Sequence, residues 1–350
     1  MFGPTGAGKS TLLAMIAAQF RRYKNSSIFA FDKGMSMFPL VSAAGGTHYE
    51  IAGDDSSLAF CPLRGVDDDS EQAWAEDWIT TLCTMQKVEI KPEHRSSIHN
   101  AVTQIRNSPP SHRTLSNLYH YLQHQELKEA INHYTVQGAM GKLLDAQTDS
   151  MAIETFTVFE IEELMNLGEE NLIPVLLYIF HCIEKSFKGQ PSLLILDEAW
   201  VMLGHPVFRQ KIREWLKVLR KANCAVVLAT QSLSDAKNSG ILDVLNESCP
   251  TKIFLPNLTA NQDIQLDLYR GFGLNSAQIN IITKAAPKRE YYVSSSEGRR
   301  LINLALSPLA LAFVGASSKE HIASIKNLIQ ENGQTWPRAW LVERGVTFKT

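Results

Sequence analysis

Several features are scarce in this sequence of 350 residues, and each absence excludes a class of protein. The five cysteines are scattered without a CxxC pair, which argues against a disulfide framework or a zinc site and favours a reducing compartment. No apolar run reaches the roughly 20 residues of a membrane span, and no basic-then-apolar leader opens the chain. With 34 Lys+Arg against 36 Asp+Glu, bulk positive charge for coating nucleic acid is lacking. We therefore expect a soluble, cytoplasmic protein.

The hydrophobic pattern predicts an α/β fold. Apolar runs bounded by turn residues alternate with helical patterns over most of the chain, which is typical of a mostly parallel sheet. Strands are expected at Ser27–Phe31, Thr155–Glu160, Ser192–Leu196, Cys224–Ala229 and Thr251–Leu255. Helices are expected at Lys9–Arg22, Glu169–Phe187, Pro206–Ala222, Ser239–Glu247 and Ser318–Glu331. Near the C-terminus, Glu290–Val293 and Arg300–Ala305 are expected to pair as a hairpin.

Residues 65–148 have a different character from the rest. They contain few β-branched runs, and apolar residues recur at helical spacing, as in Leu115, Leu118 and Leu122. We therefore predict an all-helical insertion at 65–148 within a core formed by 1–64 and 149–332, followed by a C-terminal tail at 333–350.

A phosphate-binding loop is the strongest signal in the chain. The octapeptide Gly3-Pro4-Thr5-Gly6-Ala7-Gly8-Lys9-Ser10 is a complete GxxxxGKS pattern, with Thr11 continuing into a helix. Glycines let successive N–H groups curl around a phosphate, Lys9 reaches the β- and γ-phosphates, and the Ser10 hydroxyl ligates Mg²⁺. ATP and Mg²⁺ are the expected ligands. A strand must feed such a loop, yet only two residues precede Gly3, so we expect a fragment with a truncated first strand.

Two acids follow a buried strand. Leu193–Leu196 are apolar, and Asp197 and Glu198 come next, which places both carboxylates at the carboxyl edge of a parallel sheet. Asp197 is a candidate Mg²⁺ ligand, and Glu198 is a candidate general base for the attacking water. Alone this pattern is common, but together with the loop it predicts nucleotide hydrolysis.

The next strand also ends in polar residues, Thr230-Gln231-Ser232. Gln231 is a candidate sensor of the nucleotide state, because a polar side chain at this position can contact both the γ-phosphate and the lytic water. Ser232 suits an ordinary helix N-cap. The two interpretations are compatible.

A basic stripe precedes that strand. Arg209, Arg213, Lys217 and Arg220 recur at spacings of four, four and three, opposite an apolar face that includes Ile212 and Leu219. The stripe is either a solvated face or a subunit interface that delivers an arginine to the γ-phosphate of a neighbour.

A metal site is weakly indicated elsewhere. His120 and His124 have the spacing of two ligands on one helix face, but the pattern HYLQH lacks a catalytic Glu and a third ligand. We do not predict a metal there.

The motifs together resemble a known family. The loop, the Asp-Glu pair and the strand-end Gln are similar to those of RecA-like ring ATPases of the FtsK/HerA group. More closely, the ordered blocks look like the C-terminal ATPase domain of the TrbE/CagE family of conjugative-transfer and type IV secretion ATPases. These blocks are GPTGAGKSTLL, FDKG, LAFCPL, LLILDEAW, EWLKVLRKAN, ATQS and KIFLPN.

The resemblance implies a RecA-like P-loop NTPase core with an all-helical appendage, ATP hydrolysis and hexamer-type association with other secretion or conjugation channel components. It also implies residence on the cytoplasmic face of the bacterial inner membrane. By similarity to related DNA-coupling ATPases, Arg220 matches the position of an arginine that acts in trans. The sequence thus predicts an ATPase that energises a type IV secretion or conjugation apparatus. The alternatives are a DNA-translocating ring ATPase of the coupling-protein or HerA–FtsK type, and a non-catalytic nucleotide-binding scaffold.

Overall fold

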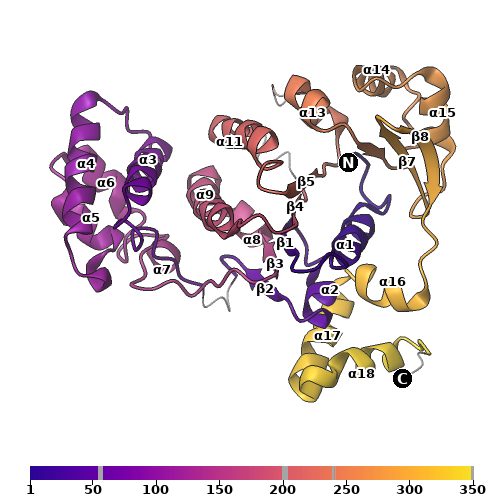
Figure 1. Cartoon of the computed structure of the whole chain (residues 1–350), viewed down its shortest axis with the longest axis horizontal. Coiled ribbons are helices and arrows are strands. Elements are labelled where there is room, and N and C mark those ends of the chain that lie inside the picture. Colours follow the sequence, from indigo (N-terminus) through magenta and orange to yellow (C-terminus); the bar gives the residue numbers. More distant parts are fainter. Residues whose placement is uncertain (54–57, 199–203, 239, 241, 348–350) are drawn as a thin grey trace. The chain divides into compact units, whose positions relative to one another are not determined.

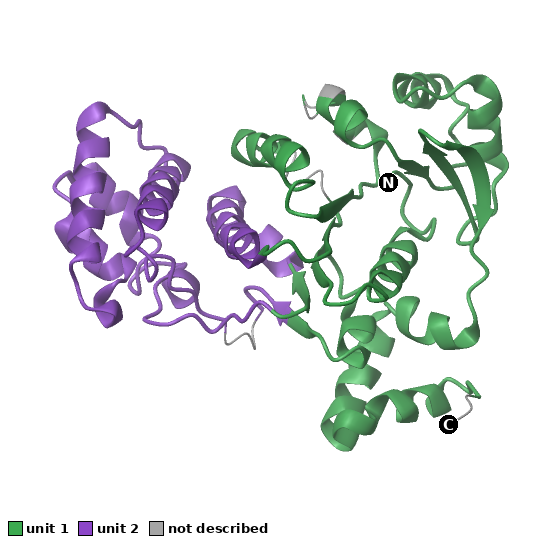
Figure 2. Cartoon of the chain, in the orientation of Figure 1, with its two compact units in different colours: residues 1–48, 154–160, 187–350 green, residues 49–153, 161–186 purple. Residues whose placement is uncertain are grey.

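The chain divides into two compact units (Figure 2). The computed structural model describes residues 1–53, 58–198, 204–238, 240 and 242–347. Unit 1 comprises residues 1–48, 154–160 and 187–350, and unit 2 comprises 49–153 and 161–186. Unit 2 thus contains segments on both sides of the predicted insertion. The boundaries of the inserted domain at residues 65 and 148 stay a prediction.

Unit 1 is built on a mostly parallel sheet, as expected (Figure 1). Its strands are β1 (Ser27–Asp32), β2 (Thr47–Glu50), β3 (Phe156–Glu160), β4 (Ser192–Leu196) and β5 (Cys224–Leu228), in the order β2-β3-β1-β4-β5. β1 is parallel to both β3 and β4, and β4 is parallel to β5. Every residue of β1, β3 and β4 is buried, which explains why these strands are continuous apolar runs instead of alternating ones. Four of the five predicted strands lie in this sheet, which also contains β2, a strand that was not predicted. The fifth, predicted at Thr251–Leu255, lies in the second sheet.

A second, antiparallel sheet continues from the first. It contains β6 (Lys252–Phe254), β7 (Glu290–Ser295) and β8 (Gly298–Asn303), so the predicted hairpin is present. Phe2 forms parallel bridges to both Thr230 and Phe254, with its N–H donated to Ile253 O and its carbonyl accepting from Leu255 N, each at 2.8 Å. Phe2 therefore lies in the strand position that leads into the phosphate-binding loop, between the two sheets.

In unit 1, helices pack on both sheets and on one another. They are α1 (Lys9–Phe20), α2 (Phe38–Ala43), α11 (Pro206–Val218), α12 (Leu233–Asn238), α13 (Leu242–Ser248), α14 (Asp263–Gly271), α15 (Ser276–Lys284), α16 (Pro308–Val314), α17 (Lys319–Asn332) and α18 (Trp336–Glu343), with the short 3-10 helix η2 (Gly333–Thr335). On one face of the sheet, Leu13 of α1, Val41 of α2 and Val314 of α16 pack in a single core cluster with Ile28 and Ile195.

One helix of unit 1 is shorter than predicted. α11 ends at Val218, four residues before the predicted end, and the chain turns to β5 with Asn223 at a left-handed φ of 58°. Ser239, the expected start of the next helix, lies outside the described residues. Within the predicted C-terminal tail, α18 buries Trp336 and Trp340 in a cluster with Ile325.

Unit 2 is helical, in agreement with the sequence pattern. Its helices are α3 (Asp69–Met85), α4 (Pro92–Arg106), the 3-10 helix η1 (Pro110–His112), α5 (Leu115–Tyr121), α6 (Gln125–Asn132), α7 (Gly141–Leu144), α8 (Glu162–Asn166) and α9 (Glu169–Ser186). The indole N–H of Trp78 in α3 donates to Pro174 O in α9 at 3.0 Å, which links α9 to this unit. None of the helices within the described residues combines the length and apolar composition needed to cross a bilayer.

Candidate functional site

The octapeptide forms a loop at the carboxyl edge of the parallel sheet, between the Phe2 position and α1. Gly6 and Gly8 have left-handed φ values of 79° and 100°, which side-chain-bearing residues rarely adopt. α1 begins at Lys9, so the loop leads directly into a helix N-terminus. Ser10 and Thr11 lie half-buried in its first turn. Curled backbone followed by a helix N-terminus is the geometry that binds phosphate groups.

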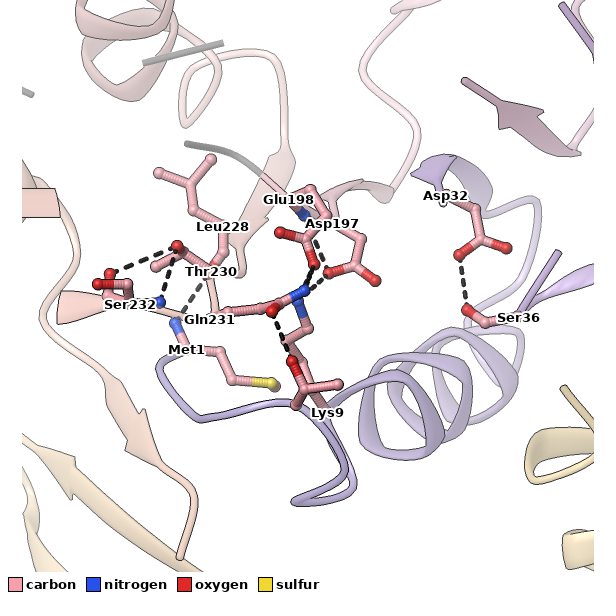
Figure 3. A network of polar contacts seen from close by, with 11 residues as sticks. Met1, Lys9, Asp32, Ser36, Asp197, Glu198, Leu228, Thr230, Gln231 and Ser232 are labelled. Carbon is pink, nitrogen blue, oxygen red and sulfur yellow. Dashed lines mark hydrogen bonds and ion pairs between the residues drawn. The ribbon is translucent and has the colours of Figure 1, made fainter. Parts of the chain in front are cut away.

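Lys9 is buried between the two acids that follow β4. Its ammonium lies 2.9 Å from Asp197 Oδ1 and 2.6 Å from Glu198 Oε1, and its side chain is only 8% exposed. Figure 3 shows the three side chains converging at this point. Burial raises the pKa of the Asp197 carboxyl, and the neighbouring ammonium of Lys9 partly opposes this shift. The loop and the Asp-Glu pair therefore lie together, as the sequence predicts.

Gln231 completes a chain of side-chain hydrogen bonds at the same edge. Its Nε2 donates to Glu198 Oε1 at 2.5 Å, and its Oε1 accepts from the Thr5 hydroxyl at 2.6 Å (Figure 3). The tip of the phosphate-binding loop is thus connected through Gln231 to Glu198. Ser232 also behaves as a cap, because its Oγ accepts from Ser234 N at 3.1 Å in the first turn of α12. The Ser232 cap is therefore present, and the role of Gln231 as a sensor of the nucleotide state stays a prediction.

Glu198 has an unusual backbone. Its φ is 54°, a left-handed value that costs free energy for a residue with a side chain. Its N–H donates to Asp197 Oδ1 at 3.0 Å, and only 4% of the residue is exposed. The turn directs consecutive carboxylates to one point, which a regular strand, with its alternating side chains, would not do.

A row of carboxylates, not predicted from the sequence, crosses the sheet beside this point. Register places Glu160, at the end of β3, opposite Asp32, at the end of β1. Asp197 follows Leu196, the register partner of Phe31, so it comes next in the row. Asp32 is fully buried and accepts from Ser36 Oγ at 2.6 Å.

This crowding of carboxylates perturbs proton binding. Burial, followed by the neighbouring Glu160, raises the pKa of the Asp32 carboxyl to about 8. Asp32 Oδ2 also accepts from Met37 N at 2.7 Å, and Glu160 accepts from Gly34 N and Met35 N. The sequence held one signal for this row. In the FDKG block Asp32 comes at the end of an apolar strand, just as Asp197 does in LLILDEAW.

Arg220 is not brought to this site. It is exposed in the turn that follows α11 and precedes β5, which is the amino edge of the sheet. Gln231 lies beyond the carboxyl end of the same strand. Five residues at about 3.3 Å each separate the two edges, so the guanidinium does not reach its own loop.

The two histidines of HYLQH do not share a helix, which corrects that expectation. α5 ends at Tyr121, and the chain is extended at Leu122 before α6 begins. His124 lies instead near His94 and Glu126, and His94 Nε2 is 2.6 Å from Glu126 Oε1. His94 Nδ1 faces the N–H of Lys91 at 3.4 Å, which favours the tautomer with its proton on Nε2, donated to Glu126.

Comparison with known proteins agrees with these features. Residues 1–282 match the family described as the TraG P-loop domain. The chain is 57% identical over 349 residues to a probable conjugal transfer protein TrbE of Sinorhizobium fredii (strain NBRC 101917 / NGR234), covering 99% of this chain and 52% of the relative. The chain spans about half the length of the curated relatives it matches.

Solved structures show the same fold. The structure of VirB4 of Thermoanaerobacter pseudethanolicus has a TM-score of 0.69 at 15% identity, over 89% of this chain and 90% of that one. The plasmid coupling protein TrwB in complex with ADP and Mg²⁺ has a TM-score of 0.54 at 14% identity, over 87% and 84%. The fold is therefore that of a RecA-like P-loop core. The chain belongs to the TraG P-loop domain family, and the resemblance to the TrbE/CagE type is confirmed.

Proposed function

We propose that this chain hydrolyses ATP and that the hydrolysis energises a type IV secretion or conjugative transfer apparatus. The observation that carries the proposal is the meeting of Lys9, Asp197, Glu198 and Gln231 behind one phosphate-binding loop. Nucleotide hydrolysis requires a cation for phosphate, a carboxylate for a metal and a carboxylate for water, and here an amide is hydrogen-bonded to the last of these. The names of the relatives support the biological setting.

The loop residues bind the phosphates in this proposal. The backbone N–H groups of the loop, with the N-terminus of α1, face the anionic oxygens, and Lys9 transfers from the two carboxylates to the β- and γ-phosphates. Thr11 lies next to Ser10 in the first helical turn and contacts the nucleotide there. The residues proposed to bind the nucleotide are Gly3, Pro4, Thr5, Gly6, Ala7, Gly8, Lys9, Ser10 and Thr11.

Magnesium fits the donors available beside Lys9. The Ser10 hydroxyl and the Asp197 carboxylate are oxygen ligands, which Mg²⁺ prefers, and Asp197 is 2% exposed at the edge of the loop. The burial that raises the pKa of Asp197 is the environment in which a divalent cation stabilises the carboxylate. When bound, Mg²⁺ neutralises charge on the phosphate oxygens. The TrwB neighbour, which has the same fold, was solved with ADP and Mg²⁺, and this supports the assignment.

Glu198 and Gln231 are assigned to the water. Once Lys9 leaves it, the Glu198 carboxylate is available to accept a proton from a water aligned with the γ-phosphate. Gln231, hydrogen-bonded to both Glu198 and Thr5, reports whether the loop is filled. Closing the loop around phosphate pulls Thr5 and so repositions Gln231 and Glu198.

The assembly is proposed to be a homo-oligomer, a hexamer by family implication, with Arg220 acting on the neighbouring subunit. Its further partners are other components of the secretion or conjugation channel, and its site of action is the cytoplasmic face of the inner membrane. These assignments rest on the family, whereas the amino-edge position of Arg220 supports the trans role independently.

An ATPase assay tests the proposal. Phosphate release is measured for the wild-type chain and for Glu198→Gln, with and without duplex DNA, alongside the mass of the assembly. The proposal is supported if the wild-type chain hydrolyses ATP, if DNA does not change the rate, and if Glu198→Gln abolishes it. Hydrolysis that depends on DNA favours the DNA-translocating alternative, and nucleotide binding without turnover in any assembly favours the scaffold.

A further inference from the structure

The phosphate-binding loop is hydrogen-bonded from outside by the antiparallel sheet. The N–H of Lys288, two residues before β7, donates to Ala7 O at 3.0 Å. The hydroxyl of Tyr291, in β7, donates to Gly8 O at 3.2 Å. Tyr291 is fully buried in an apolar cluster that includes Ala7 and Leu255. Two consecutive carbonyls of the loop are thus fixed by residues about 280 positions away.

Fixing a carbonyl also fixes the N–H on the other side of the same peptide plane. In a trans peptide the C=O and the following N–H point in opposite directions. Because Ala7 O points toward Lys288, the N–H of Gly8 points away from the sheet. In the same way Gly8 O, which accepts from Tyr291 and from Leu12 N, sets the N–H of Lys9. These N–H groups are the phosphate donors of such loops.

The contact is close enough to constrain both backbones. A Cβ on Gly8 would lie 2.6 Å from Tyr291 Oη and 3.0 Å from Lys288 Cα. Lys288 itself adopts a left-handed φ of 64°, a costly conformation for a residue with a side chain. Strain of this kind persists where the surrounding structure holds it in place. Burial raises the pKa of Tyr291, so its hydroxyl keeps the proton it donates.

We propose that Tyr291 is a positioning residue for the nucleotide, because its hydrogen bond to Gly8 O orients the loop N–H groups toward the phosphates. The hairpin β7–β8 is then energetically coupled to the nucleotide site. Coupling between two sites is reciprocal. If the hydrogen bond from Tyr291 strengthens nucleotide binding, bound nucleotide strengthens that hydrogen bond by the same free energy, and so stabilises β7. The inference rests on the proposed nucleotide binding and adds a residue that the loop motif does not contain.

The competing explanation is that a buried tyrosine hydroxyl needs some acceptor and Gly8 O is merely available. Tyr292 provides a matched control. It is 4% exposed, alternates with Tyr291 to the other face of β7, and its hydroxyl hydrogen-bonds to Gln278 away from the loop. Phenylalanine at either position removes one hydroxyl from a buried ring, and only one of the two hydroxyls contacts the loop.

Binding of a fluorescent ADP with Mg²⁺ to the wild-type chain, Tyr291→Phe and Tyr292→Phe tests the proposal. We expect Tyr291→Phe to raise Kd about three- to tenfold and to raise KM for ATP more than it lowers kcat, whereas Tyr292→Phe leaves Kd unchanged. Thermal unfolding should show that the two variants lose similar stability. Equal ADP affinity in all three proteins would overturn the proposal.

Hydrogen exchange of the wild-type chain tests it without any substitution. ADP with Mg²⁺ should slow amide exchange in residues 290–295, and Tyr291→Phe should remove most of that protection. Slowed exchange confined to the loop and α1 contradicts the coupling. Failure of the wild-type chain to bind ADP at all overturns the proposed function, a result distinct from normal binding that is insensitive to Tyr291.

Discussion

Lys9 Nζ lies 2.6 Å from Glu198 Oε1, so the side chain assigned to phosphate is paired with the side chain assigned to water. The same ammonium lies 2.9 Å from Asp197 Oδ1. A phosphate group entering the loop must compete with both carboxylates for this cation. In the proposed function, binding therefore moves Lys9 away from Glu198, which links activation of the base to occupancy of the loop.

Glu198→Gln should separate binding from catalysis. A neutral amide holds Lys9 less strongly, so we expect nucleotide to bind about fivefold more tightly, equivalent to about 1 kcal/mol. Turnover should fall by about 10²–10⁴-fold because the base is lost. Equilibrium titration and single-turnover hydrolysis measure the two effects, with the exposed Glu297→Gln as control. Weaker nucleotide binding in Glu198→Gln would show that this carboxylate supports the loop instead of competing with phosphate.

Lys9→Met should abolish nucleotide binding and also destabilise the protein without nucleotide. Its removal takes the ammonium away from two buried carboxylates, and removing one partner of a buried ion pair typically costs about 3–5 kcal/mol. The deficit should shrink as pH falls, because Asp197, whose pKa is already raised, then takes up a proton. Urea unfolding at two pH values measures this, with the exposed Lys24→Met as control. A deficit that is the same at both pH values contradicts the electrostatic cause.

Local sequence patterns predict the parts of the site that are contiguous or end a strand. The loop is one uninterrupted octapeptide, and Asp197, Glu198 and Gln231 each follow an apolar run. Because parallel strands all end at the same edge, their meeting follows from the fold class alone. The structure adds the charge pairing with Lys9, which no spacing in the sequence reveals.

Other parts of the site depend on tertiary contacts. Tyr291 contacts Gly8 across 283 residues, and nothing near β7 marks it as part of a nucleotide site. Asp32 and Glu160 become neighbours only through the strand order β3-β1-β4. The early end of α11 has a similar cause, since Cys224 N–H donates to Leu219 O at 3.0 Å across the turn that leads into β5. Helical periodicity continues past that point, but the tertiary turn overrides it.

Asp32 gives the stability a pH dependence of definite sign. Its pKa is about 8 in the folded protein against 3.8 as the reference value, so between these the folded state keeps a proton that the unfolded chain releases. Stability from this group is therefore complete below about pH 4 and is lost as pH rises toward 8. Asp32→Asn preserves both hydrogen bonds, with its NH₂ donated to Ser36 Oγ and its oxygen accepting from Met37 N.

We expect Asp32→Asn to gain about 1–3 kcal/mol relative to wild type between pH 5 and pH 8. Urea unfolding midpoints at the two pH values measure the gain. Asp67→Asn is the control, because the hydrogen bond from Arg113 holds the pKa of the exposed Asp67 carboxyl below its usual range, so this replacement should give the same change at pH 5 and at pH 8. Parallel pH profiles for wild type and Asp32→Asn would show that Asp32 is ionised in the folded protein.

Gly3→Ala should destabilise the protein through a single contact. A Cβ on Gly3 would lie 2.3 Å from the Cβ of Leu255, a fully buried residue just after β6, and overpacking of this kind costs about 1–3 kcal/mol. Gly271→Ala, with no atom within 4 Å of the added Cβ, is the control. In a double-mutant cycle, Gly3→Ala with Leu255→Gly, which removes the Cβ at 2.3 Å, should lose at least about 1 kcal/mol less than the sum of the single changes. Strict additivity would show that Gly3→Ala loses stability for a reason other than contact with Leu255.

Arg220→Ala should abolish hydrolysis in the neighbouring subunit, because that subunit loses the guanidinium that acts on its γ-phosphate. The residue is exposed at the amino edge of the sheet, about 16 Å of strand away from the edge that carries Gln231, so it cannot serve its own loop. A trans arginine contributes about 10³–10⁵ in rate in other P-loop enzymes, whereas an ordinary surface arginine changes stability by under about 0.5 kcal/mol. Lys221→Ala, an exposed cation in the same turn, is the matched control.

Mixing Arg220→Ala subunits with Lys9→Ala subunits distinguishes these cases. Each variant is expected to be inactive alone, since one lacks the arginine and the other lacks the phosphate-binding lysine at every interface. In mixed assemblies an intact loop can face an intact arginine across one interface, so hydrolysis should return and pass through a maximum as the ratio changes. A wild-type rate for assembled Arg220→Ala alone would make Arg220 a solvated residue, and inactive mixtures of correct mass would place its role within its own subunit.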